Sequence, residues 1–354
     1  MKKLHIIIQK QLLHWFDANK RDMPWRQTTD AYKIWLSEII LQQTRVEQGL
    51  PYYNKFVNKY KNVKAFANAN ESEILKLWQG LGYYSRARNM HTAAKQIVEL
   101  HKGVFPANYD ELLKLKGVGE YTASAIASIA YGLPHAVCDG NVFRVLSRLY
   151  ANDTPINSTE GKKVFFHLAQ SLLNHHFPSQ HNQAMMELGA LVCKPTNPLC
   201  GQCPINTFCV AHQKNTIYKF PVKSRKQKST VIHLHYFVFD YKGNTYMQTR
   251  TGKGIWQGLH DFPHLEYAGK ENSPEQSIQR IQHTLAIGKM DVIKISHEYK
   301  HILTHRIIMA KFIQCTLHKP IDTKKYSLIK IKKAEINTLS LPRLIERYYE
   351  KEIF

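Results

Sequence analysis

The residue pattern changes at a short basic stretch, KFPVKSRKQK (219–228), and this change constrains the fold more than any other feature. Before it, apolar residues recur at three- and four-residue spacing, as on one face of a helix, for example over 33–47, 71–78 and 120–131. After it come runs rich in β-branched and aromatic residues, such as VIHLHYFVFD and RIIMAKFIQCTL, which are typical of strands. A basic segment without acidic residues is typical of a linker. The pattern predicts a mainly α domain followed by a smaller α+β domain.

A chain of 354 residues is long enough for two or three domains. We expect the helical domain over residues 1–215, a basic linker over 216–230 and the α+β domain over 231–354. The apolar run near the N-terminus is cut short by Gln9, Lys10 and Gln11, so it does not form a signal peptide. No segment approaches the ~18 unbroken apolar residues of a membrane span. We therefore expect a soluble, cytoplasmic protein without a membrane partner.

The formal net charge of +22 indicates what this surface attracts. A strong excess of Lys and Arg favours polyanionic partners, and nucleic acid is the first candidate. An acidic membrane face is the second candidate. The alternative to both is a ribosome-associated or merely basic protein.

Four of the six cysteines lie close together in CKPTNPLCGQCPINTFC: Cys193, Cys200, Cys203 and Cys209. Without an export signal, this spacing favours a metal centre over disulfides. Four thiolates on a short loop suit zinc or an iron–sulfur cluster. The asymmetric C-x6-C-x2-C-x5-C spacing and the intervening prolines favour a [4Fe–4S] cluster, with zinc as the alternative.

A glycine turn, Gly117-Val118-Gly119, separates two helical patterns and is followed about twenty residues later by Asp139. Glycines at such a turn expose backbone N–H groups at the start of the next helix, where a phosphate is favoured. A helix-hairpin-helix holds DNA in this way without reading its sequence. The turn can equally be structural, and Asp139 alone is more typical of a helix N-cap than of a catalytic group.

A third unusual stretch, WLSEIILQQTRV (35–46), places Glu38 among apolar residues. Together with the hairpin, Asp139 and the cysteine spacing, it resembles the MutY adenine-DNA glycosylases of the endonuclease III, or helix-hairpin-helix, superfamily. Further motifs carry the resemblance in the family's order along nearly the whole chain: MPWR, QGLGYYSRARN, LKGVGEYTASAI, DGNVFRVLSR, QAMMELGALVC and GIWQGLHDFP. The resemblance implies a six-helix barrel over about 9–135, and an iron–sulfur module over about 136–215 that includes the N-terminus. A MutT-like (Nudix) domain would follow.

The family's residue roles carry over to matching positions of this chain. Glu38 would be the general acid and Asp139 the second carboxylate, with support from Tyr121 and Asn141. The four clustered cysteines would hold one [4Fe–4S] cluster. The adenine pocket would include Trp25, Arg26, Leu41, Gln183 and Met186. Gln43 and Tyr83 would enter the duplex stack beside the flipped base, and Thr44 would lie near the lesion base.

The implied reaction is hydrolysis of the N-glycosidic bond of adenine mispaired with 8-oxoguanine or guanine in double-stranded DNA. The leaving adenine needs a proton and the sugar develops positive charge, so one neutral and one ionised carboxyl group suit the reaction. Apolar neighbours would raise the pKa of Glu38, while Asp139 would stay ionised. We expect a monomeric, nucleoid-associated bacterial enzyme.

Tyr121 stands where strand-cleaving relatives carry a lysine that forms a Schiff base. A phenol cannot form an imine, so the sequence predicts a monofunctional enzyme that leaves an abasic site. Lys114 and Lys116 lie close enough in sequence for weak adventitious strand cleavage. The alternatives are a bifunctional pyrimidine glycosylase/lyase, which Tyr121 argues against, and a non-catalytic DNA-binding protein, which the Glu38/Asp139 pair argues against.

The C-terminal domain is expected to bind rather than hydrolyse. A Nudix hydrolase holds Mg²⁺ with glutamates, but the matching positions carry Gln282, Leu285 and Ala286. The family senses 8-oxoguanine through a Phe-Ser-His loop. The nearest matches are Leu303-Thr304-His305 and Ile295-Ser296-His297, and we favour the first because a strand pattern follows it. His305 is then the candidate lesion contact, with an ordinary surface histidine as the alternative.

Overall fold

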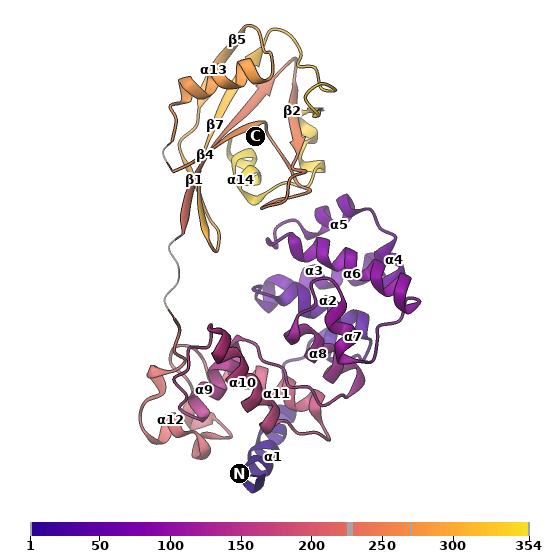
Figure 1. Cartoon of the computed structure of the whole chain (residues 1–354), viewed down its shortest axis with the longest axis vertical. Coiled ribbons are helices and arrows are strands. Elements are labelled where there is room, and N and C mark those ends of the chain that lie inside the picture. The colour runs from indigo at the N-terminus through magenta and orange to yellow at the C-terminus, as the bar shows by residue number, and fades with distance from the viewer. Residues whose placement is uncertain (1, 225–228, 270, 353–354) are drawn as a thin grey trace. The chain divides into compact units, whose positions relative to one another are not determined.

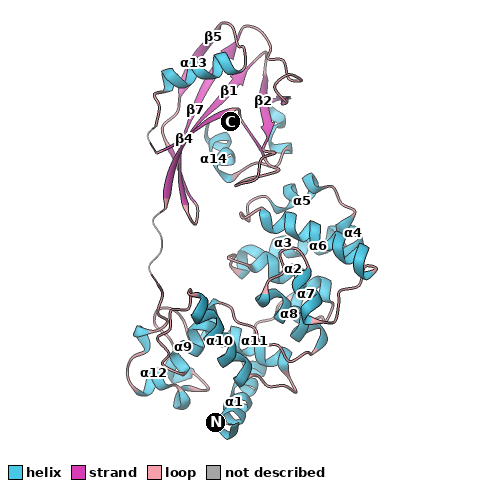
Figure 2. Ribbon diagram, viewed as in Figure 1, coloured by secondary structure: helices cyan, strands magenta, loops and turns pink. Residues whose placement is uncertain are grey.

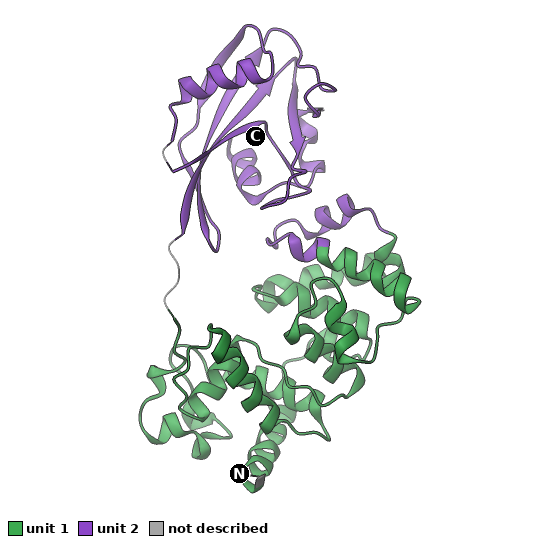
Figure 3. Ribbon diagram, viewed as in Figure 1, with its two compact units in different colours: residues 1–68, 89–225 green, residues 69–88, 226–354 purple. Residues whose placement is uncertain are grey.

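The computed structural model describes residues 2–224, 229–269 and 271–352. Arg225–Lys228, part of the predicted basic linker, lie outside the described residues. The chain divides into two compact units, one formed by residues 1–68 and 89–225 and the other by residues 69–88 and 226–354 (Figure 3). The domain boundaries predicted at residues 215 and 230 stay predictions.

The first unit is helical (Figures 1 and 2). Its helices are α1 (Lys2–Asn19), α2 (Ala31–Leu41), α3 (Val46–Lys59), α4 (Val63–Ala67), most of α6 (Ser85–His101), α7 (Tyr109–Lys114), α8 (Glu120–Tyr131), α9 (Gly140–Leu149), α10 (Thr159–Leu172), α11 (Pro178–Leu191) and α12 (Val210–Gln213). Short 3-10 turns lie at Pro24–Arg26, Cys200–Gln202, Asn206–Phe208 and Ile217–Lys219. Apolar side chains of α1, α9, α10 and α11 form one continuous core.

The helix α2 is almost entirely buried, and it is shorter than its sequence pattern predicts. Asp30 caps its first turn by accepting a hydrogen bond from Tyr32 N. The predicted helix over 33–47 is wrong beyond Leu41, because the chain turns there and Gln43 adopts a left-handed φ of 56°. Thr44 N donates to Leu41 O at 3.1 Å, which closes the turn, and α3 begins at Val46. Apolar periodicity continues across the break, so the pattern alone does not reveal it.

The predicted hairpin joins α7 to α8 through a turn that requires glycine at one position. Gly117 has a φ of +77°, and a Cβ there would lie 2.6 Å from the Cβ of Asn89. Gly119 has an ordinary φ and open space around it, and it serves as the N-cap of α8. The turn therefore leaves the first backbone N–H groups of α8 at its end, and their contact with a phosphate stays a prediction.

The described residues of the second unit form two sheets, three complete α-helices, one 3-10 helix and the first turn of α6. Its elements are α5 (Glu71–Trp78), β1 (Thr230–Asp240), β2 (Asn244–Thr249), β3 (His260–Asp261), β4 (His264–Ala268), α13 (Pro274–Thr284), β5 (Met290–Ile295), β6 (Tyr299–Ile302), β7 (Arg306–Leu317), β8 (Leu328–Lys332), the 3-10 helix Lys333–Thr338 and α14 (Arg343–Glu352). One sheet has the order β4-β1-β7-β5, with β6 also paired to β7, and the other has the order β3-β2-β8. Strands β1 and β7 are parallel, with Thr230 opposite Arg306, and the other pairs are antiparallel.

Residues 69–88 belong to this second unit, although they precede the linker by well over a hundred residues. The Nζ atom of Lys76 donates to Leu339 O at 2.9 Å, and the Tyr84 hydroxyl donates to Leu341 O at 3.1 Å. Sequence patterns assign these residues to the helical domain, because contacts over such a separation leave no local signal.

Candidate active site

Most of the predicted catalytic and substrate-binding residues line one cavity of about 200 Å³ in the helical unit. The cavity lies where the Pro24–Arg26 turn, α2, α8, the start of α9 and α11 come together. The predicted residues that line it are Trp25, Arg26, Glu38, Leu41, Thr44, Tyr121, Asp139, Asn141, Gln183 and Met186. Gln43 is exposed and is not among the residues lining this cavity. Tyr83 and His305 belong to the other unit.

Glu38 is buried on the inner face of α2, with 8% of its surface exposed. Burial, and more weakly the charge of Asp139, raise the pKa of Glu38 to about 7, although a hydrogen bond from Tyr121 opposes the rise. The Tyr121 hydroxyl donates to Oε2 of Glu38 at 2.5 Å. The arrangement is that of a carboxylic acid which keeps its proton near neutral pH while one of its oxygens is fixed by a phenol.

Asp139 is both the N-cap of α9 and a wall of the cavity. Its Oδ1 accepts from Val142 N at 2.7 Å, and its Oδ2 accepts from the Asn141 side-chain amide at 2.8 Å. Burial outweighs the other effects and raises the pKa of Asp139 above its usual value, although these hydrogen bonds and the charge of Arg144 oppose the rise. The capping interpretation of Asp139 was thus structurally right, and it is compatible with a second role because the capping carboxylate also faces the cavity.

Hydrogen bonds connect Asp139 to the cysteine loop. Asn141 accepts from Arg144 at 2.8 Å, and the Nε atom of Arg144 donates to the carbonyl oxygen of Cys193 at 2.7 Å. Arg144 also donates to Gly189 O on α11. These bonds hold the start of α9 against both α11 and the cysteine loop, so the position of the Asp139 carboxylate depends on all three.

The four clustered cysteines line a small, almost wholly apolar cavity. Burial and, more weakly, the neighbouring thiols Cys193, Cys209 and Cys200 raise the pKa of Cys203 to about 12, although a backbone hydrogen bond opposes the rise. Four thiols gathered in such a place ionise only when bound cations neutralise them, as in a metal cluster. Arg148 donates to the Cys193 sulfur at 3.3 Å and offers one positive charge beside the site. The donor set fits a metal–thiolate centre.

Glu187 is a site residue that sequence reasoning did not assign. It is 1% exposed, and it accepts paired hydrogen bonds from the guanidinium groups of Arg21 and Arg26 at 2.8–3.1 Å. Burial would raise the pKa of Glu187, but the bonds from the two arginines outweigh it and hold this pKa at about 2. The ionised Glu187 thereby fixes Arg26 in the wall of the cavity. The sequence does show a glutamate directly after Met186 in QAMMELGALVC. Its arginine partners lie more than 160 residues away in the chain, so the sequence alone does not reveal the ion pairs.

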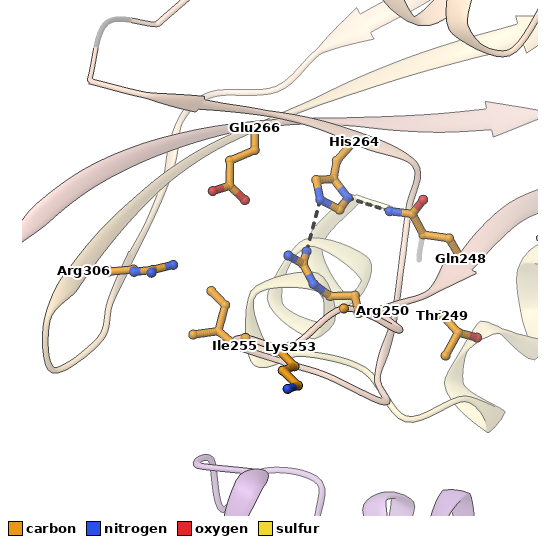
Figure 4. A pocket seen from close by; sticks show the side chains of 10 residues that line it. Gln248, Thr249, Arg250, Lys253, Ile255, His264, Glu266 and Arg306 are labelled. Atoms are coloured by element: carbon orange, nitrogen blue, oxygen red, sulfur yellow. Dashed lines mark hydrogen bonds between the residues drawn. The ribbon is translucent and has the colours of Figure 1, made fainter.

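A second cavity, of about 340 Å³, lies in the sheet unit (Figure 4). Its walls carry Arg250, Lys253 and Arg306, together with His264 and Glu266. Arg250 is held by the buried Asp261 at 2.7 Å and contacts Nε2 of His264 at 3.2 Å. Arg306 begins β7 directly after His305, so this basic cavity lies beside the turn that carries the predicted lesion contact.

Residues 36–170 match the HhH-GPD superfamily of base excision DNA repair proteins, residues 193–209 match the iron–sulfur binding domain of endonuclease III, and residues 235–351 match the NUDIX domain. These matches confirm the predicted two-domain fold class. The match over residues 193–209 also confirms the predicted cofactor, one [4Fe–4S] cluster. The assignment of the four clustered cysteines as its ligands stays a prediction.

Several curated relatives are called "Adenine DNA glycosylase". One from Buchnera aphidicola subsp. Baizongia pistaciae is 33% identical over 316 residues, covering 89% of this chain and 87% of the relative. The human relative is 44% identical over 212 residues, covering 57% of this chain and 39% of the relative. A solved thermostable thymine-DNA glycosylase shares 29% identity at a TM-score of 0.56, covering 60% of this chain and 98% of that one. None of the described helices could span a membrane.

Proposed function

Since the chain belongs to the adenine DNA glycosylase family, and is therefore a hydrolase of N-glycosyl bonds in base excision repair, we propose that it removes adenine mispaired with 8-oxoguanine or guanine and leaves an abasic site. The observation that carries the proposal is the pair of carboxyl groups, Glu38 and Asp139, in the wall of one cavity. The target adenine must leave the stack of the duplex to reach them.

Glu38 is the proton donor in this proposal. Its pKa of about 7 leaves a large fraction protonated near neutral pH, as a general acid requires. Tyr121 donates to Oε2 of Glu38, so Oε1 is left to carry the proton toward the leaving adenine. Protonation of the base is needed because an adenine anion is a poor leaving group.

Asp139 is the ionised partner. Its two oxygens accept separate hydrogen bonds, and it lies at the N-terminus of α9, where negative charge is favoured. An ionised carboxylate fixed in this way stabilises the positive charge that develops on the sugar as the glycosidic bond breaks. Tyr121 thus acts on the acid and Asn141 on the carboxylate.

The flipped adenine would occupy the cavity against Trp25, Arg26, Leu41, Gln183 and Met186. Trp25 and Leu41 offer apolar surface, while Arg26 and Gln183 offer hydrogen-bond donors to the ring nitrogens. Because Glu187 holds Arg26 in place, the donors are positioned before the base arrives. Gln43 and Tyr83 are proposed to enter the duplex stack, with Thr44 near the lesion base and residues 117–119 on the DNA backbone.

The enzyme is proposed to be monofunctional. Tyr121 stands where a Schiff-base lysine would be needed, and among the described residues lining the cavity the basic groups are the guanidinium groups of Arg21 and Arg26. A guanidinium group stays protonated and does not attack a sugar as an amine does. Strand cleavage is therefore not expected beyond traces from Lys114 or Lys116.

We propose that the sheet unit recognises the lesion through the turn Leu303-Thr304-His305. Leu303 N donates to Arg306 O at 2.8 Å, so this turn forms the tip of the β6–β7 hairpin. The alternative segment Ile295-Ser296-His297 is held in contacts within the fold, which leaves it less suited to contact DNA. The Ser296 hydroxyl accepts a hydrogen bond from Phe312 N, and His297 stacks on Tyr299. The basic cavity beside the turn offers Arg250, Lys253 and Arg306 to DNA phosphates.

A duplex with adenine opposite 8-oxoguanine tests the proposal. Strand breaks that appear only after alkali treatment are the expected result. Breaks without alkali that borohydride traps as a protein–DNA adduct would favour a lyase. Tight binding without any product would contradict the proposed reaction.

A further inference from the structure

We propose that the sheet unit holds a divalent transition-metal site, suited to zinc, formed by His233, Glu271 and Glu298. The three residues each direct one ligand atom into the same place, and these atoms all lie within 4.8 Å of one another. Imidazole nitrogen and carboxylate oxygen are ligands that zinc accepts, usually three from the protein with water in the fourth position. These residues are distinct from Gln282, Leu285 and Ala286, which stand at the positions of the Nudix magnesium ligands.

The environment of the Nδ1 atom of His233 indicates that a metal ion can bind here. This atom is fully buried and has no hydrogen-bond partner, which is costly for a polar group. It lies 3.9 Å from Oε2 of Glu271, a distance too long for a hydrogen bond. Two ligand atoms on one tetrahedral zinc lie about 3.4 Å apart, given bonds of about 2.1 Å. A metal between these two atoms would satisfy His233 after a small closing movement.

Neighbouring side chains fix Glu271 with its second oxygen left available. Oε1 of Glu271 accepts from His235 Nε2 at 2.8 Å and from Lys311 Nζ at 2.9 Å. His235 is in turn held through Nδ1 by the Ser277 hydroxyl of α13 at 2.8 Å. Metal-binding carboxylates are oriented by such outer hydrogen bonds.

The charges of the cluster also favour a cation. The cluster contains two carboxylates, Glu271 and Glu298, and the lysine paired with it is Lys311, which contacts Glu271. The cluster therefore carries a net negative charge when its histidines are neutral.

A metal here would join three separate segments: strand β1, the connection from β4 to α13, and the connection from β5 to β6. Glu298 directly precedes β6, which leads into the turn with Thr304 and His305. The metal would therefore stiffen the base of the hairpin whose tip is proposed to meet the lesion, although zinc binding itself does not depend on that role.

The site is tested by measuring the zinc and iron content per chain in the same preparation of the purified full-length protein. With the iron complement of the cluster intact, we expect one zinc per chain after equilibration with zinc and gel filtration. Glu298→Gln, an exposed change that leaves the fold intact, and His233→Gln should each weaken zinc binding at least about tenfold in a chelator competition. The control His318→Gln alters a histidine paired with Asp291 elsewhere in the unit and should bind zinc like the wild type.

Equal zinc affinity in the wild type, Glu298→Gln and His233→Gln would overturn the proposal. Zinc that appears only as iron is lost would overturn it too, because the metal would then be in the cysteine loop. Adenine release measured on the same preparations reports on the glycosylase separately, so a failure of one proposal is distinguishable from a failure of the other.

Discussion

At the scale of single residues, the proposed reaction requires a protonated Glu38 and an ionised Asp139. Glu38 is buried and Asp139 is half-buried, and their environments differ. Asp139 accepts two hydrogen bonds at a helix start, whereas Glu38 accepts one from Tyr121 and lies on the buried and mainly apolar helix α2. Environments that separate two carboxyl groups in this way assign the acid and the ionised partner.

The acid role predicts how adenine release depends on pH. Because the pKa of Glu38 is about 7, the single-turnover rate should fall as pH rises through about 7. Tyr121→Phe removes a hydrogen bond that lowers this pKa, so the falling limb should move to higher pH. A limb that stays in place, measured by adenine release between pH 5 and 9, would contradict the role given to Tyr121.

The raised pKa of Glu38 also makes the free energy of unfolding depend on pH, because the folded and unfolded states bind the proton with different affinity. The unfolded Glu ionises near its ordinary value of 4.5, whereas the folded one ionises near 7. The fold therefore favours the protonated form, and this stability is present below pH 4.5 and is lost as pH rises through 7. In Glu38→Gln, denaturant unfolding of the helical domain should lose less stability between pH 5 and 8 than in the wild type. An identical pH dependence in both proteins would contradict the burial argument.

At the scale of elements, the hairpin between α7 and α8 offers a matched pair of glycines. Gly117→Ala forces a side chain into a left-handed conformation and against Asn89, so it should cost about 1–2 kcal/mol or more of stability and weaken binding to any duplex. Gly119→Ala meets open space at an ordinary φ and should change stability little. Denaturant unfolding and binding to a matched duplex measure both effects, and equal losses in the two variants would count against this geometry.

The helix α11 carries a second element-scale prediction. Glu187→Ala leaves Arg26, whose side chain is 14% exposed, without its buried partner. Breaking a buried ion pair should destabilise the fold by about 3 kcal/mol, the lower end of the usual range because both arginines are partly exposed. The exposed Glu160→Ala serves as the control. A loss below about 1 kcal/mol in denaturant unfolding would show that the pair is not needed for stability.

The same elements show where sequence reasoning succeeds and where it stops. Spacing alone located α8 and the cysteine loop, because their signals are local. It missed the break at Gln43, since apolar periodicity runs across it. It left Glu187 unassigned, because a single glutamate in a helical pattern is usually exposed to solvent. Only the tertiary structure places Arg21 and Arg26 beside it. The parallel pairing of β1 with β7 joins Thr230 to Arg306 and has no local signal either.

At the scale of the whole molecule, one chain combines a helical unit that can do the chemistry with a sheet unit proposed to read the lesion. His305→Ala should therefore lower the preference for adenine opposite 8-oxoguanine over adenine opposite guanine, while leaving excision opposite guanine nearly unchanged. The control His318→Ala should keep the preference. Competition between the two duplexes measures it, and an unchanged ratio in His305→Ala would remove this residue from lesion recognition.

The central claim is that Glu38 supplies the proton that releases adenine, and one comparison tests it most directly. Free adenine released from a duplex with adenine opposite 8-oxoguanine is measured under single-turnover conditions for the wild type, Glu38→Gln and the exposed control Glu160→Gln. We predict that Glu38→Gln binds the duplex like the wild type but releases adenine about 10²–10⁴-fold more slowly, while Glu160→Gln keeps the wild-type rate. Adenine release by Glu38→Gln at the wild-type rate would contradict the account.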